Sequence, residues 1–214
     1  MAATYKTTER TRVRRMPQRG VYDREVVHKI IDEAIVCNIG VSVDGKPRVI
    51  PTAILRIDEA VYIHGSINSQ LLKVLAAGAP ACITVSHIDG LVAARSGFNC
   101  AVDYRAVVMF AQAEDITDAK EKAAVFDKFV EHILPGHKVR PPSKKELNAT
   151  KILRFPIVEV SAKVRDTGVN DFEEDLALDF WAGTIPMKTT FGPPKSCKKL
   201  RPEIKIPDYA KARA

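Results

Sequence analysis

The chain has 214 residues, 46% of them hydrophobic and 28% charged, which is the composition of an ordinary globular protein. No apolar run approaches the roughly 20 residues that span a bilayer, and the basic N-terminus is not followed by the apolar segment of a signal peptide. We therefore expect a soluble, cytoplasmic protein with no membrane partner.

The net charge of +7 is concentrated at the two ends. Residues 1–20 hold six Lys/Arg and one acid, residues 188–214 hold eight and two, and the remainder is therefore mildly acidic. A fold that binds nucleic acid normally carries its basic residues itself, so we do not expect nucleic acid as the partner. The chain is divided into a basic arm (1–20), one folded domain (21–187) and a basic Pro/Lys-rich tail (188–214).

The first predicted elements are a helix and a β-hairpin. Asp23 is a helix cap, and apolar residues recur at helical spacing over residues 26–34. Strands are expected over residues 35–43 and 48–57, joined by Asp44-Gly45, because Asp-Gly supplies the positive φ angles of a tight turn.

The next segment predicts a strand over residues 61–64, a turn at Gly65 and a helix that opens at Asn68 or Ser69. Free N–H groups at a helix start attract phosphate, so this opening is a candidate anion site. An ordinary capped surface helix is the alternative.

The rest of the domain alternates short strands with two helices. Strands are expected over residues 81–86, 91–94, 104–113 and 152–160. Asp118 and Glu121 resemble a capping box that opens a helix ending at Pro135-Gly136, and a short helix is expected over residues 143–147. Many strands without regular strand–helix alternation favour an antiparallel barrel with attached helices.

Cysteines and histidines show no metal-binding spacing. The four cysteines (Cys37, Cys82, Cys100, Cys197) form no CxxC pair, and the five histidines form no HxH or HExxH motif. The sequence therefore predicts neither a metal site nor a disulfide framework.

Four segments together carry a family resemblance: GKPRVIPT at 45–52, VYIHGSINSQLLKVL at 61–75, DYRAVVMFAQAE at 103–114, and SAKVR at 161–165 with WAGTIP at 181–186. In this order they resemble the pyridoxamine 5′-phosphate oxidase-like FMN-binding split-barrel family, in the branch that contains nitroimidazole-resistance and flavin-nucleotide-binding proteins. The resemblance implies a mainly β (α+β) fold, a six-stranded antiparallel split β-barrel with peripheral helices. It also implies a homodimer with FMN at the subunit interface.

The resemblance further implies which residues bind the cofactor. The flavin ring would lie along Arg48, Val49, Ile50, Pro51 and Thr52. The ribityl chain and phosphate would lie against His64, Gly65, Ser69, Gln70 and Lys73. The partner chain would contribute Tyr104, Arg105 and Ala106, and the pocket wall would be completed by Lys163, Arg165 and Trp181. Two alternatives stay open. Trp181 is a core or interface filler in one, and Arg105 and Arg165 form ion pairs with Asp103 or Asp166 in the other.

His64 is the candidate catalytic residue, because a histidine lies in the active site at this position in the nitroimidazole-resistance branch. At a strand end beside Gly65 it is expected to be exposed and to titrate near neutral pH. A structural role is the alternative.

The sequence also departs from the oxidase pattern. Gln70 and Leu71 stand where the oxidase has two basic residues, so Lys73 or an arginine from elsewhere would have to hold the phosphate. The C-terminal arginine–histidine pair of the oxidase has no counterpart, so pyridoxamine phosphate oxidation is not predicted.

The predicted function is an FMN-dependent oxidoreductase acting on a small molecule, with NAD(P)H or a partner reductase as electron donor and the cofactor doing the redox chemistry. One alternative is a non-catalytic flavin-binding or redox-sensing protein. Another is a barrel that has lost FMN and binds nucleic acid or an acidic protein through its basic ends.

Overall fold

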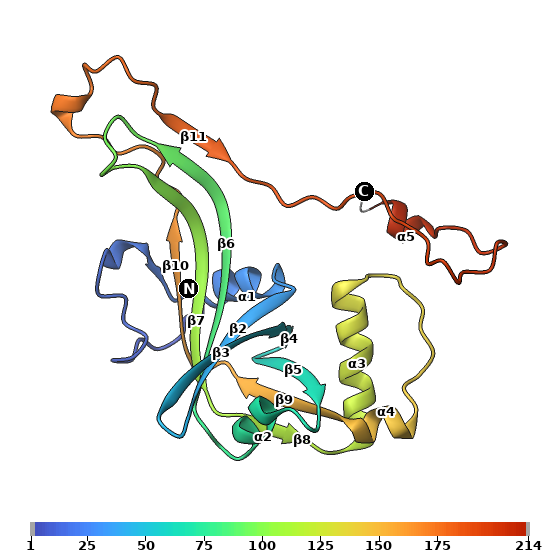
Figure 1. The fold of residues 1–214 in the computed structure, drawn as a ribbon. Helices are drawn as coiled ribbons and strands as arrows, with labels where there is room; N and C mark the ends of the chain where they lie inside the picture. The colour runs from blue at the N-terminus through green and yellow to red at the C-terminus, as the bar shows by residue number, and fades with distance from the viewer. Residues whose placement is uncertain (1–2, 213–214) are drawn as a thin grey trace.

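A computed structural model describes residues 3–212, which form two antiparallel sheets with helices at their edges (Figure 1). The larger sheet has the order β1-β10-β7-β6-β2-β3, with β11 added on β6, and the smaller has the order β4-β5-β9-β8. The strands of the larger sheet are β1 (Gly20–Val21), β2 (Val36–Val43), β3 (Lys46–Ala53), β6 (Ala81–Ala93), β7 (Ala101–Ala111), β10 (Glu159–Arg165) and β11 (Gly183–Pro186). Those of the smaller sheet are β4 (Leu55–Ile57), β5 (Ala60–Ser66), β8 (Glu114–Ile116) and β9 (Thr150–Pro156). The expected antiparallel split barrel with peripheral helices is confirmed.

The first four α-helices begin at a side chain that caps the helix by a hydrogen bond. The helices are α1 (Arg24–Asp32), α2 (Gln70–Ala76), α3 (Ala119–Ile133), α4 (Lys144–Ala149) and α5 (Asp208–Lys211), with 3-10 turns η1 (Pro17–Arg19) and η2 (Glu173–Asp175). Asp23, Ser69 and Asp118 each accept a backbone N–H from the first turn of their helix. Ser69, rather than Asn68, is the cap of α2. The fully reciprocal capping box lies at Ser143 of α4, not at Asp118.

Two of the predicted strands are each divided between the sheets. The expected strand 48–57 breaks at Ile54, which separates β3 from β4, and the expected strand 152–160 breaks after Pro156, which separates β9 from β10. Each break lets the chain cross from one sheet to the other, and Ile54 and Ile157 fill the corners as buried side chains. Neither corner contains glycine, so the apolar runs look continuous in the sequence.

In β6, by contrast, two predicted strands are joined into one. The sequence predicts two strands, 81–86 and 91–94, yet one strand runs from Ala81 to Ala93. The strand continues through a bulge, where the register against β7 shifts between Ile88 and Gly90. Gly90 allows β11 to pack closely there, because a Cβ would lie only 3.2 Å from the Ile185 carbonyl oxygen.

The main core lies between the two sheets and α1. It joins Ile39, Ile63, Met109 and Phe155, all at most 1% exposed, with the buried face of α1. A second, smaller cluster lies under α3 around Phe129 and Ile152. Both clusters depend on apolar side chains that alternate along the strands.

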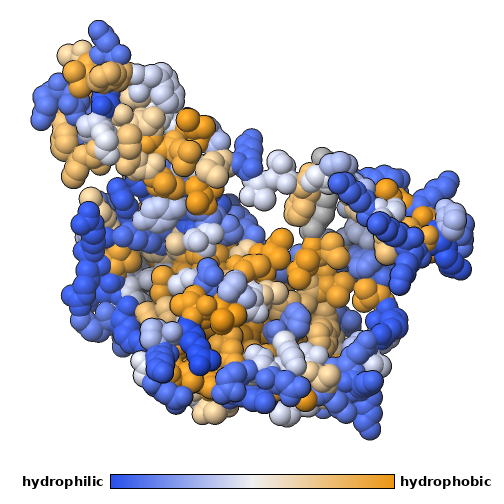
Figure 2. Space-filling model, viewed as in Figure 1, coloured by the Kyte–Doolittle hydropathy of each residue, from blue (hydrophilic) through white to orange (hydrophobic). Residues whose placement is uncertain are grey.

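Beyond the core, β6 and β7 continue as a long hairpin that projects from the body (Figure 1). We call residues 88–104 with residues 166–187, including β11, the hairpin arm. It exposes many large apolar side chains, among them Phe98, Phe172, Phe180, Trp181 and Ile185. Figure 2 shows apolar colour on this projection and across the centre of the body.

Both basic ends are packed against the domain. Tyr5 is 4% exposed and belongs to the main core, and Thr11 is buried as well. The C-terminal tail leaves β11 and reaches α5, which lies near the connection between α3 and α4 (Figure 1). The N-terminal basic segment (1–20) is therefore tied to the folded domain through Tyr5.

Candidate functional site

The predicted ring-binding residues lie on β3, an edge strand of the larger sheet. Val49 is 65% exposed and Ile50 is 43% exposed, so this edge carries apolar surface that a single chain leaves uncovered. Beside it is a groove of about 300 Å³ lined by Arg48, Val49, Arg10 and Phe110, among others. The Arg10 guanidinium lies 4.3 Å from the centre of the Phe110 ring. The groove combines apolar cover with two cations.

The predicted phosphate-binding residues surround the start of α2. The Ser69 hydroxyl accepts the Leu72 N–H at 3.4 Å, and the Asn68 N–H donates to the Ser66 hydroxyl at 3.1 Å. Gln70 and Lys73 are exposed and free to approach an anion. Gly65 brings β5 against the helix, because a Cβ there would lie 3.0 Å from Leu72 Cδ1.

The sequence predicts an exposed His64, but the structure does not expose it. Its ring is packed edge-on against Phe126 and Phe129 of α3, with ring centres 5.5 and 4.5 Å away. Burial lowers the pKa of His64, and Nδ1 is enclosed without a hydrogen-bond partner. A neutral imidazole between two phenyl rings suits a packing role better than proton transfer.

Arg105 is held by carboxylates of its own chain. It makes a two-bond contact with Asp89 at 2.8 and 2.9 Å and a third bond to Glu33 at 2.6 Å. The hydrogen bonds that Arg105 donates to Asp89 raise the pKa of Arg105 further above its ordinary range. The ion-pair alternative is thus observed for Arg105, although with partners other than Asp103 or Asp166.

Arg165 is buried and forms an ion pair with Asp103, as the same alternative predicts. A second bond reaches the Gly168 carbonyl at 2.9 Å. Nearby, Arg95 binds Asp171 at 2.8 Å. These pairs join the strands at the base of the hairpin arm to the segment that follows β10.

Tyr104, Ala106 and Lys163 belong to neighbouring positions of the larger sheet. Ala106 pairs with Lys163, and Tyr104 pairs with Arg165. Because side chains alternate along a strand, Tyr104 and Ala106 share the face opposite to that of Arg105.

Trp181 lies on the hairpin arm and is 66% exposed. Its ring covers Gly183, where a Cβ would meet Trp181 Cζ2 at 2.7 Å. Gly183 pairs with Ala93 at the far end of β6, whereas α2 precedes the near end at Ala81. A 13-residue strand at about 3.3 Å per residue sets these ends at most roughly 40 Å apart, and Figure 1 shows α2 and β11 at opposite ends of the molecule. Within one chain Trp181 and Ser69 therefore cannot line one pocket.

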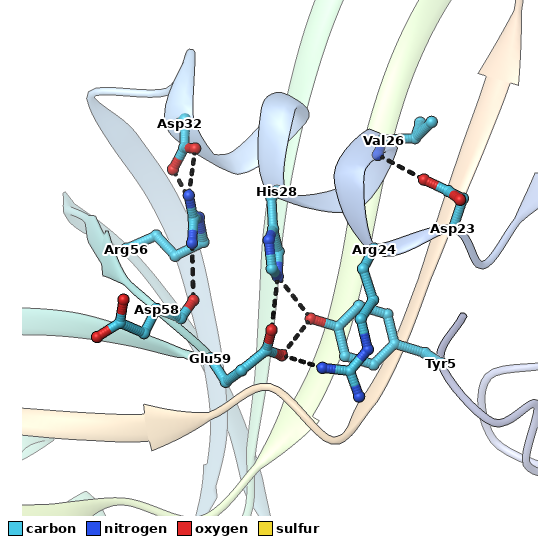
Figure 3. Close-up of polar contacts among 9 residues, drawn as sticks. All are labelled: Tyr5, Asp23, Arg24, Val26, His28, Asp32, Arg56, Asp58 and Glu59. Carbon is cyan, nitrogen blue, oxygen red and sulfur yellow. Dashed lines mark hydrogen bonds and ion pairs between the residues drawn. The ribbon is translucent and has the colours of Figure 1, made fainter. Parts of the chain in front are cut away.

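A polar cluster at the N-terminus was missed by sequence reasoning (Figure 3). The Tyr5 hydroxyl donates to Glu59 at 2.9 Å and lies 2.7 Å from His28 Nε2, while Arg24 binds Glu59 at 2.8 Å. Burial raises the pKa of Tyr5 and lowers that of His28. Although burial by itself favours a protonated Glu59, the bonds from Tyr5 and Arg24 outweigh it and lower the pKa of Glu59. The cluster fixes the N-terminal segment to α1; a lone tyrosine in a polar, basic segment gave no signal of it.

Two hollows under the C-terminal tail were also missed. One, of about 850 Å³, lies between the end of α1, the middle of β6 and residues 187–191. The other, of about 560 Å³, lies between residues 136–138 and residues 194–210 and is mostly apolar. We call the second hollow the tail pocket. The tail reads as a polar linker in the sequence, so nothing there indicated a cavity.

Residues 3–212 contain neither a membrane-spanning helix nor a cluster of metal ligands. No helix in this part of the chain is long and apolar enough to cross a membrane. No group of three or more His, Cys, Asp or Glu side chains within the same residues is placed to hold a metal ion.

Comparison with solved structures gives matches over almost the whole chain. The flavocytochrome Anf3 from Azotobacter vinelandii is 36% identical, with a TM-score of 0.91 and 97% of each chain covered. The FAD and heme binding protein from Mycobacterium smegmatis is 30% identical, with a TM-score of 0.87 over 91% of this chain and 97% of that one. A candidate 5-nitroimidazole antibiotic resistance protein from Bacteroides thetaiotaomicron shares the fold at 22% identity and a TM-score of 0.58, over 68% of this chain and 86% of that one. No curated protein sequence matches.

The family assignment rests on a sequence match as well. Residues 23–164, about two thirds of the chain, match the family described as pyridoxamine 5′-phosphate oxidase. The match begins at the cap of α1 and ends in β10, so it contains the whole smaller sheet and most of the larger one. The resemblance carried by the four sequence segments is thereby confirmed: this chain belongs to the pyridoxamine 5′-phosphate oxidase family.

Proposed function

We propose that the protein binds both a flavin and a heme and works as an oxidoreductase that passes electrons between them and a small molecule. One observation carries the proposal: the similarity to the flavocytochrome covers 97% of both chains. The family match ends at residue 164, so the similarity to the flavocytochrome must also include nearly all of residues 165–214. The hairpin arm and tail are thus shared with a protein described as a flavocytochrome.

The residues around β3 and α2 fit a flavin. A flavin ring needs apolar cover with a few hydrogen bonds, and the exposed Val49 and Ile50 supply such a surface. A phosphate needs cations and N–H or hydroxyl donors, and Lys73 with the Ser66 and Ser69 region supplies them. Arg48 and Arg10 beside the groove are further cations for a flavin nucleotide.

Of the two flavin nucleotides we propose FAD. The family resemblance implies FMN, but the relative from Mycobacterium smegmatis is described as binding FAD and heme. The absence of two basic residues at Gln70 and Leu71 weakens the usual seat for a single terminal phosphate. A dinucleotide spreads its charge over two phosphates and gains further contacts from its adenosine.

We further propose a homodimer in which each flavin site draws on both chains. The large apolar side chains exposed on β3 and on the hairpin arm support this, since exposed apolar patches mark interaction surfaces. Only a partner chain would bring Trp181 and Tyr104 to a flavin bound at β3 and α2. Lys163, on the same sheet face as Ala106, would join them there.

When bound, the flavin supplies two-electron and one-electron transfer and the heme supplies one-electron transfer. The chain itself binds, orients and shields the groups. His64 does not act as a proton donor in this proposal, because it is neutral and packed between Phe126 and Phe129. The sequence has no GxGxxG fingerprint, so NAD(P)H would bind only transiently as an electron donor.

The test is the absorbance spectrum of the purified protein, with the mass of whatever heat releases. Flavin bands together with a heme Soret band are expected, and the released flavin should have the mass of FAD. A released flavin with the mass of FMN would overturn the FAD assignment alone. A colourless protein that takes up neither added flavin nor added hemin would overturn the proposal.

Turnover separates an enzyme from a non-catalytic flavin carrier or sensor. We expect NAD(P)H, or a reductase supplied in the assay, to bleach the flavin bands and then shift the heme spectrum to its reduced form. Reoxidation by oxygen or a nitro compound should follow with repeated cycles. A flavin that stays oxidised with every donor would favour the sensor.

A further inference from the structure

The tail pocket is formed between two segments that are distant in sequence. Residues 136–138, just after α3, form one wall, and residues 194–210 of the C-terminal tail form the other. Gly136 lies against Tyr209, since a Cβ at Gly136 would be 3.6 Å from Tyr209 Cβ. Figure 1 shows α5 beside the α3–α4 connection, where these segments meet.

The lining has the chemistry that a porphyrin requires. Leu200, Ile204 and Ile206 present aliphatic surface, and the volume of about 560 Å³ is within the range of pockets for organic ligands. Lys138, Lys195 and Lys205 also line it, and the described lining residues include no carboxylate. A heme is a flat apolar ring with two anionic propionates, so aliphatic walls with lysines match both of its parts.

His137 presents a nitrogen to bind iron. Its Nδ1 lies 2.5 Å from the Tyr209 hydroxyl, while none of the described residues bonds its Nε2. Histidines that bind metals usually donate their second ring N–H to an oxygen, which fixes the ring and the tautomer. With Nδ1–H donating to the Tyr209 oxygen, Nε2 carries the lone pair that an iron ion needs.

Three other histidines use Nε2 within the fold. His28 Nε2 contacts the Tyr5 hydroxyl, His87 Nε2 the Ile30 carbonyl and His132 Nε2 the Ala34 carbonyl. Binding iron through Nε2 would break each of these contacts. His137 loses no such contact.

His64 is the remaining histidine. It lacks the orienting partner, because its Nδ1 is enclosed with no hydrogen bond and its ring is packed against Phe126 and Phe129. His137 therefore combines an oriented ring, an available Nε2 and a position on an apolar hollow.

We propose that the tail pocket is the heme site, with His137 Nε2 as an axial iron ligand, Tyr209 as the residue that positions it, and the lining lysines near the propionates. This inference rests on the proposed function, which supplies the heme, and adds where it binds. It also assigns the tail a role: the tail forms one wall of the heme site.

The first experiment compares His137→Ala with His132→Gln, a control on the nearby α3 helix whose glutamine amide can still donate to the Ala34 carbonyl. Heme per chain is measured by pyridine hemochrome, before and after titration with hemin, and flavin per chain is measured in the same samples. We expect His137→Ala to lose its bound heme or to bind hemin at least about tenfold more weakly, with flavin content unchanged. The control should keep both cofactors.

Rescue guards against a folding artefact. In His137→Gly, added imidazole should restore the Soret band, since the free base can occupy the ligand position. Tyr209→Phe should keep the heme but lower the iron–histidine stretching frequency in resonance Raman spectra, because the imidazole loses its hydrogen-bond acceptor. A merely structural role for Tyr209 would leave that frequency unchanged and overturn its positioning role.

The outcomes separate heme binding itself from the place where the heme binds. If the wild-type chain takes up no heme even from added hemin, the heme part of the proposed function fails. If the wild type binds one heme and His137→Ala binds it with the same affinity and spectrum, the proposed function stands and the tail pocket assignment is overturned.

Discussion

The barrel core and the hairpin arm share the strands β6 and β7 but are stabilised in different ways. In the core half, Val85 pairs with Val107 and both are buried. At the base of the arm, ion pairs such as Arg165–Asp103 join the strands, and the large apolar side chains of the arm point outward. One continuous hairpin therefore has an end that folds on its own apolar contacts and an end whose apolar surface is available to another molecule.

The largest expected effect comes from matched phenylalanine substitutions in the two regions. Phe155→Ala empties a fully buried core position and should lower the free energy of unfolding by about 3–5 kcal/mol. Phe98→Ala, at an 85% exposed position on the arm where the ring stacks on Phe172, should change it by under about 0.5 kcal/mol for the chain measured below the concentration at which it associates. Urea unfolding of both variants measures the difference. Equal losses would mean that the arm is as tightly packed as the core.

The next effect concerns the ion pairs of the arm. Arg165→Met leaves Asp103 buried without its partner, which should cost about 3 kcal/mol, and the loss should be concentrated in the arm. Hydrogen exchange should rise at residues 88–104 while the amides of β5 and β9 stay protected. The double variant Arg165→Met with Asp103→Leu should recover part of the loss. Uniform loss of protection would contradict a separately stabilised arm.

A smaller effect is expected at the exposed end of the arm. Trp181→Ser, at a 66% exposed position, should weaken the proposed homodimer by at least about 1 kcal/mol, because aromatic residues contribute most at interfaces. Light scattering against concentration measures this. Lys188→Ser, just beyond β11, is the control and should leave the association unchanged. An unaffected assembly in Trp181→Ser would place the interface elsewhere.

The helix cap of α2 gives an effect of about 1 kcal/mol. Ser69→Ala removes the acceptor of the Leu72 N–H and should lower the stability by that amount. If the flavin phosphate lies here, Ser69→Ala should also weaken flavin binding, which fluorescence titration measures. Ser143→Ala removes the matching cap of α4 and should cost similar stability with no change in flavin affinity.

The smallest effect is the pH dependence contributed by His64. Its pKa in the fold is lowered by burial, so the unfolded chain binds more protons and stability falls as the pH drops below about 6.5. His64→Leu keeps the contact with Phe126 and Phe129 and should flatten the decline in Tm between about pH 7 and pH 5. An unchanged slope would assign the acid sensitivity to other groups, such as His28.

Sequence reasoning predicted the parts of the fold that have a local signal. Asp23, Ser69 and Asp118 cap their helices because each places an acceptor before an apolar helical pattern, and Asp44-Gly45 forms its hairpin turn. The crossings at Ile54 and after Pro156 were missed, because a strand that changes sheets keeps its apolar residues and changes only its pairing partners.

In the candidate site, too, only features with a local sequence signal could be anticipated. The sequence proposes residues of β3 and the start of α2 as flavin-binding, because a short motif carries them, and their role stays a prediction. The tail pocket was not predicted, since it needs His137 and Tyr209 to meet across 72 residues of sequence. For Arg105 the sequence left two interpretations open, and only the positions of Asp89 and Glu33 in space identify its partners.

The anchoring of Tyr5 and Tyr209 has a practical consequence for protein engineering. Basic ends of this kind are commonly trimmed or fused to affinity tags. Here Tyr5 fills the core and bonds Glu59, while Tyr209 bonds His137 close to the other end. Deleting ten residues from either end would remove one of these tyrosines, so fusions that preserve both ends, joined through flexible spacers, are the safer design.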